Sequence, residues 1–171
     1  YNELGVTDVV VKAQVLSGKR GKNNGIKFCS TAEEAAAAAE ELFNMSIRGQ
    51  FVEAVLIEEK LDIAAEHYLS ITYDTIKKQP TVIYSDQGGI DIEDVAEEKI
   101  IKTNFDIRNE NIQTDLPVAA MLWQCFLAQD ARVVEINPLV KTRGGDWVAA
   151  DAKVALDEDA FFRHEEWQHF A

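Results

Sequence analysis

The sequence predicts an α+β protein with a largely antiparallel sheet and packed helices. Short segments rich in Val, Ile, Thr and Tyr indicate strands, and polar turns of a few residues separate them, as expected for antiparallel neighbours. Two longer segments, at residues 32–43 and 115–129, have the spacing and the start signals of helices. A chain of 171 residues with 47% hydrophobic and 27% charged residues forms one large domain or two small ones.

The first elements are predicted to be two strands and a helix. Residues 9–15 are rich in β-branched side chains, and a polar loop with several glycines separates them from a second strand at residues 26–29. Ser30 or Thr31 is the expected N-cap of the helix at residues 32–43. Its acidic first turn suits the positive end of the helix dipole, and its alanine run has high helix propensity.

The chain is predicted to enter a second unit near residues 47–50, which gives an N-terminal subdomain at residues 1–51 and a C-terminal subdomain at residues 52–171. In the second subdomain we expect a meander of strands at residues 52–57, 68–73 and 81–84, a short acidic helix at 91–98, and a longer helix at 115–129 that packs on the sheet. The tail at residues 161–171 contains aromatic side chains without a partner that the sequence identifies.

The charge of the chain argues against nucleic acid as a partner. Thirty acidic residues against 17 basic ones give a net charge of −13, which opposes binding to DNA, RNA or anionic membranes. No apolar run approaches the roughly 20 residues of a membrane span. Cys29 and Cys125 are far apart, and we expect buried reduced thiols in a reducing compartment, the cytoplasm or the mitochondrial matrix. The first residues resemble neither a signal peptide nor an initiation site, so a fragment is expected.

A candidate metal site lies in a predicted hairpin near the C-terminus. Glu135 and Asn137 share one face of a strand, and Asp151 and Lys153 share one face of the next. If Thr142 pairs with Asp146 across the glycine-containing turn, Asn137 lies opposite Asp151. One amide oxygen and one carboxylate are enough for Mg²⁺ that arrives with a nucleotide. The alternative is an amphipathic hairpin whose polar face is only hydrated.

Basic residues in the first loop suggest an anion site. Lys12 lies on a strand that leads into Lys19-Arg20-Gly21-Lys22, where backbone N–H groups and cations could surround a phosphate. A solvated hairpin tip is the alternative, because this segment matches no standard phosphate-binding motif.

Several other polar residues are weaker candidates for nucleotide contacts. Glu58 and Glu66 could bind an adenine amino group or ribose hydroxyls, or could simply be exposed ends of strands. Gln87-Gly88-Gly89 could place backbone amides near a phosphate, or be a plain turn. The three histidines show no metal-ligand spacing, so none is expected to be catalytic.

Six ordered segments together resemble the ATP-grasp region of succinyl-CoA synthetase β subunits and related NDP-forming acyl-CoA synthetases. These segments are residues 10–15, 18–25, 56–58, 68–70, 88–93 and 135–139. Asp151-Ala152-Lys153 and residues 160–164 are similar to the same family. The resemblance spans nearly the whole chain and implies an ATP-grasp fold whose N-terminal part is incomplete here.

The resemblance also implies the roles of individual residues. It assigns the nucleotide phosphates to Lys12, Lys19, Arg20 and Gly21, the adenosine to Glu58 and Glu66, and Mg²⁺ to Asn137 and Asp151. Leu61 stands where the family usually has a threonine near the adenine. In such synthetases ATP or GTP phosphorylates a histidine of a partner α subunit, the phosphoryl group passes to a carboxylate, and CoA attacks the acyl phosphate. The acceptor histidine and the CoA site are therefore expected outside this chain, which should be inactive alone.

Departures from the family pattern leave the substrate open. Leu16 and Lys19 replace a histidine and a glycine of the phosphate loop, and Lys19-Arg20-Gly21-Lys22 is closer to ATP-citrate lyases. Gln87 replaces a glutamate before the paired glycines. The leading prediction is a part of a succinate–CoA ligase of the tricarboxylic acid cycle. A citrate or malate enzyme and a non-catalytic nucleotide-binding or structural module are the alternatives.

Overall fold

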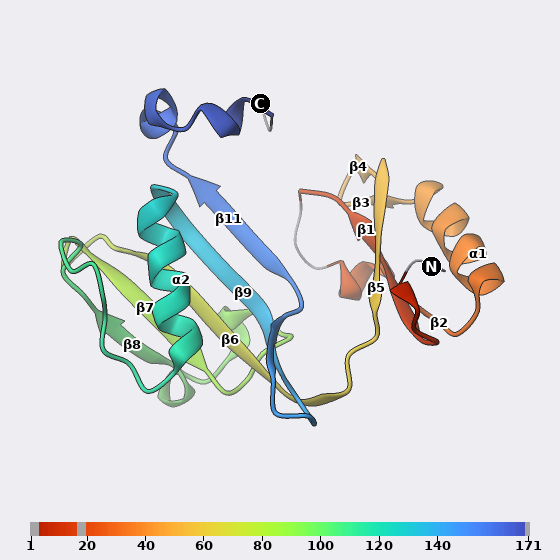
Figure 1. Ribbon diagram of the computed structural model, residues 1–171, viewed down its shortest axis with the longest axis horizontal. Helices are drawn as coiled ribbons and strands as arrows, with labels where there is room; N and C mark the ends of the chain where they lie inside the picture. The colour runs from red at the N-terminus through yellow and green to blue at the C-terminus, as the bar shows by residue number, and fades with distance from the viewer. Residues whose placement is uncertain (1–3, 17–19, 170–171) are drawn as a thin grey trace. The chain divides into compact units, whose positions relative to one another are not determined.

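The computed structural model describes residues 4–16 and 20–169, and the chain divides into two compact units (Figure 1). Unit 1 is Tyr1–Leu61 and unit 2 is Asp62–Ala171. The α+β class predicted from the sequence is confirmed, because every strand pair in the described residues is antiparallel and two α-helices are present there. None of the described helices is both long enough and apolar enough to cross a membrane.

Unit 1 is a three-stranded sheet with one helix. The sheet has the order β2-β1-β5, with β1 at Val9–Gln14, β2 at Ile26–Cys29 and β5 at Ala54–Glu59. The other elements are the 3₁₀-helix η2 (Gly21–Asn23), the helix α1 (Ala32–Phe43) and the small hairpin β3 (Ser46–Ile47) and β4 (Gln50–Phe51). The core of the unit contains Val9, Val11, Ala13, Ala35, Leu42 and Ile47.

The start of α1 follows the predicted capping chemistry. Thr31 is the N-cap, and its hydroxyl accepts a hydrogen bond of 3.1 Å from Glu34 N. The Glu34 carboxylate in turn accepts a hydrogen bond of 2.8 Å from Ser30 N. The bond from Glu34 N satisfies one of the N–H groups that the first turn of a helix leaves without intrahelical partners, and the bond from Ser30 N ties the residue before the cap to the same turn.

The predicted subdomain boundary after residue 51 differs from the division after Leu61. The reason is the pairing of β5, which lies antiparallel to β1 from Val9↔Glu59 to Gln14↔Ala54. The strand predicted at residues 52–57 therefore completes the sheet of unit 1, and its assignment to the second meander was wrong. Period-two alternation marks a strand but does not identify its partner.

Unit 2 is built on a six-stranded sheet. The order is β10-β9-β6-β7-β8, and β11 also pairs with β9. The strands are β6 (Ile63–Asp74), β7 (Gln79–Ser85), β8 (Ile101–Asn104), β9 (Ala131–Thr142), β10 (Trp147–Ala149) and β11 (Ala152–Leu156). The predicted acidic helix at residues 91–98 was wrong, because the segment forms the short 3₁₀-helices η3 (Ile92–Asp94) and η4 (Glu97–Lys99).

Helix α2 (Pro117–Ala128) packs on the sheet of unit 2, as predicted, and Figure 1 shows it lying across β9 and β6. Trp123 and Phe126 of α2 are fully buried and belong to one core cluster with Leu69 and Val134 of the sheet. Cys125 is exposed on this helix, so the prediction that it is buried was wrong. Cys125 lies between Trp123 and Phe126 in the sequence, but the helical rotation between neighbouring residues turns its side chain towards solvent.

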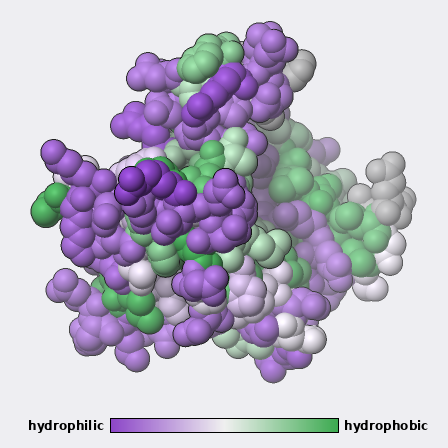
Figure 2. Space-filling view, turned by 60° about the vertical axis from the view of Figure 1, so that its left-hand side comes forward, coloured by the Kyte–Doolittle hydropathy of each residue, from purple (hydrophilic) through white to green (hydrophobic). Residues whose placement is uncertain are grey.

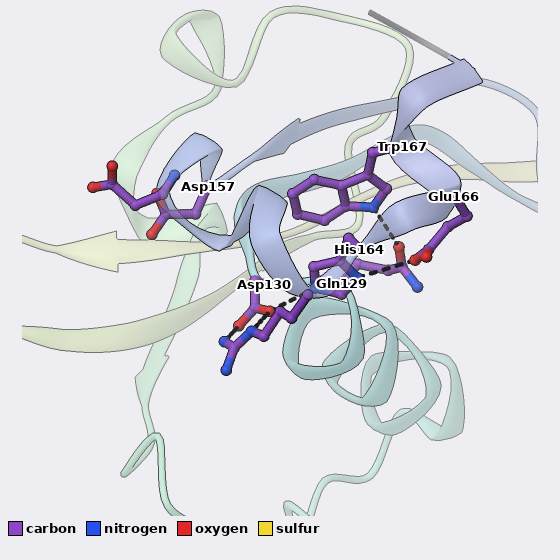
Figure 3. A network of polar contacts seen from close by, with 8 residues as sticks. Gln129, Asp130, Asp157, His164, Glu166 and Trp167 are labelled. Atoms are coloured by element: carbon purple, nitrogen blue, oxygen red, sulfur yellow. Dashed lines mark hydrogen bonds and ion pairs between the residues drawn. The ribbon is translucent and has the colours of Figure 1, made fainter.

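The tail packs where α2 meets β9, through the 3₁₀-helices η5 (Glu158–Arg163) and η6 (Glu165–His169) (Figure 3). His164 is buried and donates from Nε2 to Asp130 at 2.6 Å and from Nδ1 to Glu166 at 3.0 Å. Its ring stacks on Trp167 with centroids 4.0 Å apart, and Arg163 Nε also donates to Asp130 at 2.7 Å. The hydrogen bonds to Asp130 and then Glu166 raise the pKa of His164.

The surface reflects the charged composition of the chain. Figure 2 shows one face on which hydrophilic residues predominate and hydrophobic residues lie scattered among them. Scattered exposed apolar side chains are ordinary for a folded chain.

Candidate metal and nucleotide sites

The predicted register of the C-terminal hairpin is confirmed. Thr142 N donates to Asp146 O at 2.9 Å, and Lys153 pairs with Glu135. Between these points Asn137 N donates to Asp151 O at 3.1 Å, so Asn137 and Asp151 lie directly across from each other. Two residues with oxygen-bearing side chains, one on β9 and one between β10 and β11, therefore lie opposite each other.

A β-bulge lies at Asn137 on β9. On the neighbouring strand β6, Leu69 pairs with Ile136 and His67 pairs with Leu139, so the two residues Asn137 and Pro138 oppose one residue of β6. A bulge leaves one residue outside the ladder, which suits a proline because it has no N–H to donate. Bulges re-aim side chains, and this one lies at the predicted metal ligand.

The side chain of Asn137 is held by the loop that follows β7. Its Oδ1 accepts a hydrogen bond of 2.8 Å from Gly89 N, and its Nδ2 donates to Ile90 O at 2.9 Å. An amide oxygen has two lone pairs, so Oδ1 retains one for a cation. The donor set of one amide oxygen and the Asp151 carboxylate fits Mg²⁺, whose remaining positions phosphates and waters usually fill. Within the described residues no cluster of three or more His, Cys, Asp or Glu side chains could hold a metal ion.

Glu66 lies at the same loop. Gly88 N donates to Glu66 O at 2.9 Å, which ties the loop to β6. A Cβ atom on Gly89 would lie 2.7 Å from Glu66 Oε2, so the carboxylate is packed against that glycine. The structure therefore brings Glu66, predicted to bind adenosine, and Asn137, predicted to bind the metal, to one short loop of unit 2.

One polar pair at this site was not identified from the sequence. The Tyr68 hydroxyl donates to Glu135 Oε2 at 2.7 Å, and Tyr68 is 4% exposed. Burial raises the pKa of the Tyr68 hydroxyl, so the group remains a hydrogen-bond donor at neutral pH. The spacing of Glu66 and Tyr68, two residues apart on one strand, was the signal that could have suggested a shared polar face.

The neighbouring His67 has a packing role. Its Nδ1 shares a hydrogen bond of 2.8 Å with the Tyr84 hydroxyl, and its ring contacts Trp147 edge-on with centroids 4.9 Å apart. Burial lowers the pKa of His67.

In unit 1 the structure joins two residues that were predicted to bind different parts of the nucleotide. Lys12 of β1 forms an ion pair with Glu58 of β5, and their side chains are 14% and 36% exposed. The strand register explains the contact, because Lys12 pairs with Leu56 and Glu58 therefore lies two residues along the neighbouring strand. A phosphate that approached Lys12 would also meet the Glu58 carboxylate.

The basic loop of unit 1 is described only in part. Lys19 lies outside the described residues. Arg20 Nη1 donates to Ala13 O at 3.0 Å, and Arg20 O accepts from Gly25 N at 2.8 Å, so this residue closes the loop onto β1. Gly21 begins η2, and Leu61, which follows β5 in the chain, is half-buried.

Comparison with known proteins shows the family of this chain. Residues 1–116 match the family model described as the ATP-grasp domain. The chain belongs to the ATP-grasp family. The fold predicted through the resemblance is thus confirmed, and the candidate site residues fall into two groups, one in each unit.

Relatives of similar sequence are named succinate–CoA ligase β subunits. The ADP-forming one of Methanocaldococcus jannaschii is 46% identical over 186 residues, covering 95% of this chain and 51% of the relative. The GDP-forming one of Thermus thermophilus is 39% identical, covering 91% of this chain and 47% of the relative. The chain spans about half the length of the relatives it matches.

Solved structures share the fold at lower sequence identity. The ATP citrate lyase of Methanothrix soehngenii, in complex with citrate and coenzyme A, matches with a TM-score of 0.75 and 23% identity over 99% of this chain and 44% of that one. The dinucleotide-forming acetyl-coenzyme A synthetase 1 of Candidatus Korarchaeum cryptofilum matches with a TM-score of 0.66 and 16% identity, covering 91% of this chain and 79% of that one.

Proposed function

We propose that this chain is the nucleotide-binding portion of the β subunit of an acid–CoA ligase that forms succinyl-CoA and releases a nucleoside diphosphate. The ATP-grasp family membership and the named succinate–CoA ligase relatives support the proposal. The observation that carries it is the juxtaposition of Asn137 and Asp151 across the hairpin, joined by the bond from Asn137 N to Asp151 O.

In this proposal unit 2 holds the metal. Asn137 Oδ1 and the Asp151 carboxylate bind Mg²⁺ that is already coordinated by nucleotide phosphates, and Glu66 bonds to the adenosine part. Bound there, Mg²⁺ neutralises the phosphate charge that develops during phosphoryl transfer. The protein groups contribute by holding their oxygens in place, because positioning and charge stabilisation account for most of the catalysis of such transfers.

We propose that unit 1 supplies groups for phosphates and adenosine. Lys12, Lys19, Arg20 and the backbone of Gly21 would contact phosphate oxygens, and Glu58 and Leu61 would line the adenosine side. The ion pair between Lys12 and Glu58 supports a defined position for the ammonium group, because a paired lysine keeps fewer side-chain conformations than a free one. ATP and GTP remain alternative nucleotides.

The reaction requires groups beyond this chain. We propose that a partner α subunit carries the histidine that accepts the γ-phosphoryl group, and that it binds CoA as the second substrate. The phosphoryl group would pass from that histidine to succinate, and the CoA thiol would then displace phosphate from the acyl phosphate. Cys29 and Cys125 are both free thiols, which supports a reducing compartment, the cytoplasm or the mitochondrial matrix.

Isothermal titration calorimetry with MgATP tests the nucleotide site. We expect Asp151→Ala to weaken MgATP binding by about tenfold or more, which corresponds to ~1.4 kcal/mol or more. Asp146→Ala is the matched control, because it removes an exposed carboxylate from the tip of the same hairpin. Equal binding by wild type and Asp151→Ala would exclude Asp151 from the metal site. Absence of heat from a folded wild-type sample would favour a structural module without nucleotide.

The substrate is tested with the full-length β chain and its α partner. Nucleotide hydrolysis that depends on CoA would be compared with succinate, citrate, malate and acetate, and we expect the highest rate with succinate. A citrate enzyme is the second candidate, because the string Lys19-Arg20-Gly21-Lys22 resembles ATP-citrate lyases more than succinyl-CoA synthetases. A preference for citrate would replace the succinate proposal and leave the nucleotide site intact.

A further inference from the structure

The loop Gly88-Gly89-Ile90 contacts two of the candidate site residues of unit 2, Glu66 and Asn137, through its backbone. Gly88 N is bonded to Glu66 O, Gly89 N to Asn137 Oδ1, and Ile90 O to Asn137 Nδ2. The loop follows β7, passes the end of β6 and reaches β9, so it links three strands at the predicted site. The two bonds to Asn137 join residues 48 and 47 positions apart in the sequence.

The two glycines leave no room for side chains in this arrangement. A Cβ atom on Gly88 would lie 2.2 Å from the His67 carbonyl oxygen, which is backbone and cannot move aside independently. A Cβ atom on Gly89 would lie 2.7 Å from Glu66 Oε2, and Gly89 has a φ of +74°, where L residues are strained. The loop can therefore approach β6 and Asn137 this closely only with glycine at these positions.

The loop also decides which way the Asn137 amide points. An asparagine amide can rotate by a half-turn, which exchanges its oxygen and nitrogen. In the rotated state the NH₂ group would face Gly89 N–H, donor against donor, and the oxygen would face the Ile90 carbonyl, acceptor against acceptor. The two observed bonds exclude that state. A fixed direction of Oδ1 matters for a metal ligand, since outer contacts orient ligands and influence metal affinity.

We propose that the Gly88–Ile90 loop is a positioning element for the metal ligand Asn137, which it holds with Oδ1 available to a divalent cation. The inference rests on the proposed function, because it assumes that Asn137 binds the cation. It adds that the loop backbone, through Gly89 N–H and the Ile90 carbonyl, controls how tightly that cation is bound.

Mn²⁺ binding in the presence of ATP tests the inference, measured on the full-length protein from the loss of the free-ion paramagnetic resonance signal beyond the loss that the same ATP concentration causes without protein. Gly88→Ala should push the loop away from β6 and weaken Mn²⁺ binding by about tenfold or more, the usual effect of losing an outer contact of a metal ligand. Gly144→Ala is the matched control in unit 2. Its Cβ atom would meet Thr142 Oγ1 at 3.6 Å and Asp146 Oδ2 at 3.7 Å, which are ordinary contacts, so binding should be unchanged.

The variant Asn137→Asp tests whether the loop orients residue 137 or whether this residue only supplies an oxygen ligand. This test remains valid even if Gly88→Ala does not fold. A carboxylate is a good Mn²⁺ ligand and adds negative charge beside Asp151, so a ligand without positioning would bind the ion as tightly as wild type or tighter. A carboxylate cannot donate to the Ile90 carbonyl. Repulsion between that carboxylate and the Ile90 carbonyl oxygen should turn the side chain away from the loop, so we expect weaker Mn²⁺ binding and faster hydrogen exchange at the Gly89 amide.

The outcomes distinguish this inference from the proposed function. Normal Mn²⁺ binding by wild type and by folded Gly88→Ala would overturn the inference alone, and so would binding by Asn137→Asp that is equal to wild type or tighter. If Gly88→Ala does not fold, the Asn137→Asp comparison decides. Wild-type protein that binds no Mn²⁺ with ATP would overturn the metal site, and the inference with it.

Discussion

Val134 and Val154 offer a matched test of how the fold supports the site. The two residues are direct cross-strand partners on β9 and β11, yet Val134 is 1% exposed and Val154 is 53% exposed. Val134 belongs to the core cluster that contains Trp123 and Phe126 of α2. On β9 it precedes Glu135 and Asn137, whose side chains lie on the opposite face of the strand from this core.

Alanine at each position should have different effects on stability. Val134→Ala removes two buried carbon atoms, which loses about 1.6 kcal/mol of transfer free energy at ~0.8 kcal/mol each. The cavity that remains raises the loss in the free energy of unfolding to about 2–3 kcal/mol. Val154→Ala should lose only about 0.5–1 kcal/mol, since roughly half of its side chain already contacts water. For a unit of this size we expect Tm to fall by about 10 °C for Val134→Ala and about 3 °C for Val154→Ala.

Urea and thermal unfolding, followed by circular dichroism, would measure both variants. MgATP affinity at a temperature where each variant is folded should stay near the wild-type value, because neither side chain is a proposed ligand. Equal losses in the free energy of unfolding for the two variants would refute the argument that burial of β9 beneath α2 determines how much each substitution destabilises the protein. A loss of MgATP affinity in folded Val134→Ala would show that the core beneath β9 sets the geometry of Asn137.

Three further predictions concern hydrogen bonds elsewhere in the chain. In the tail, the pKa of His164 is raised above its ordinary 6.5 and that of Asp130 is lowered below 3.8. The stabilisation from His164 should be full below pH 6.5 and lost as the pH rises through its folded pKa, and that from Asp130 should be lost as the pH falls through its own lowered pKa. The stability difference between wild type and His164→Gln should therefore be larger at about pH 5.5 than at about pH 8.5, and a difference independent of pH would contradict a protonated His164. Tyr68→Phe removes the donor to Glu135 and should lower the free energy of unfolding by about 1–2 kcal/mol in urea titrations, and no change would mean that water replaces the hydroxyl without cost. Thr31→Ala should lower it by about 1 kcal/mol through loss of the N-cap, whereas Thr31→Ser should stay close to wild type.

Local features of this protein could be predicted because they depend on neighbouring residues. The turn at residues 143–145 and period-two alternation are enough to place Asn137 opposite Asp151, since a hairpin allows few registers once its turn is set. The start of α1 at Thr31 follows in the same way, because a cap satisfies N–H groups within three residues of itself. The family resemblance added roles for these residues, which local patterns do not reveal.

Contacts between segments distant in the sequence could not be predicted, because they depend on which strands pair and which apolar faces pack together in the folded chain. A strand at residues 52–57 was expected, but its pairing with the edge of β1 was not. Because of this pairing, unit 1 extends to Leu61 and Lys12 lies beside Glu58. The hydrogen bonds of Gly89 and Ile90 to the Asn137 side chain likewise form only once β6, β7 and β9 lie side by side in the sheet. Alternation along a strand predicts which face is apolar, but the partner strand is determined by the packing of the complete chain.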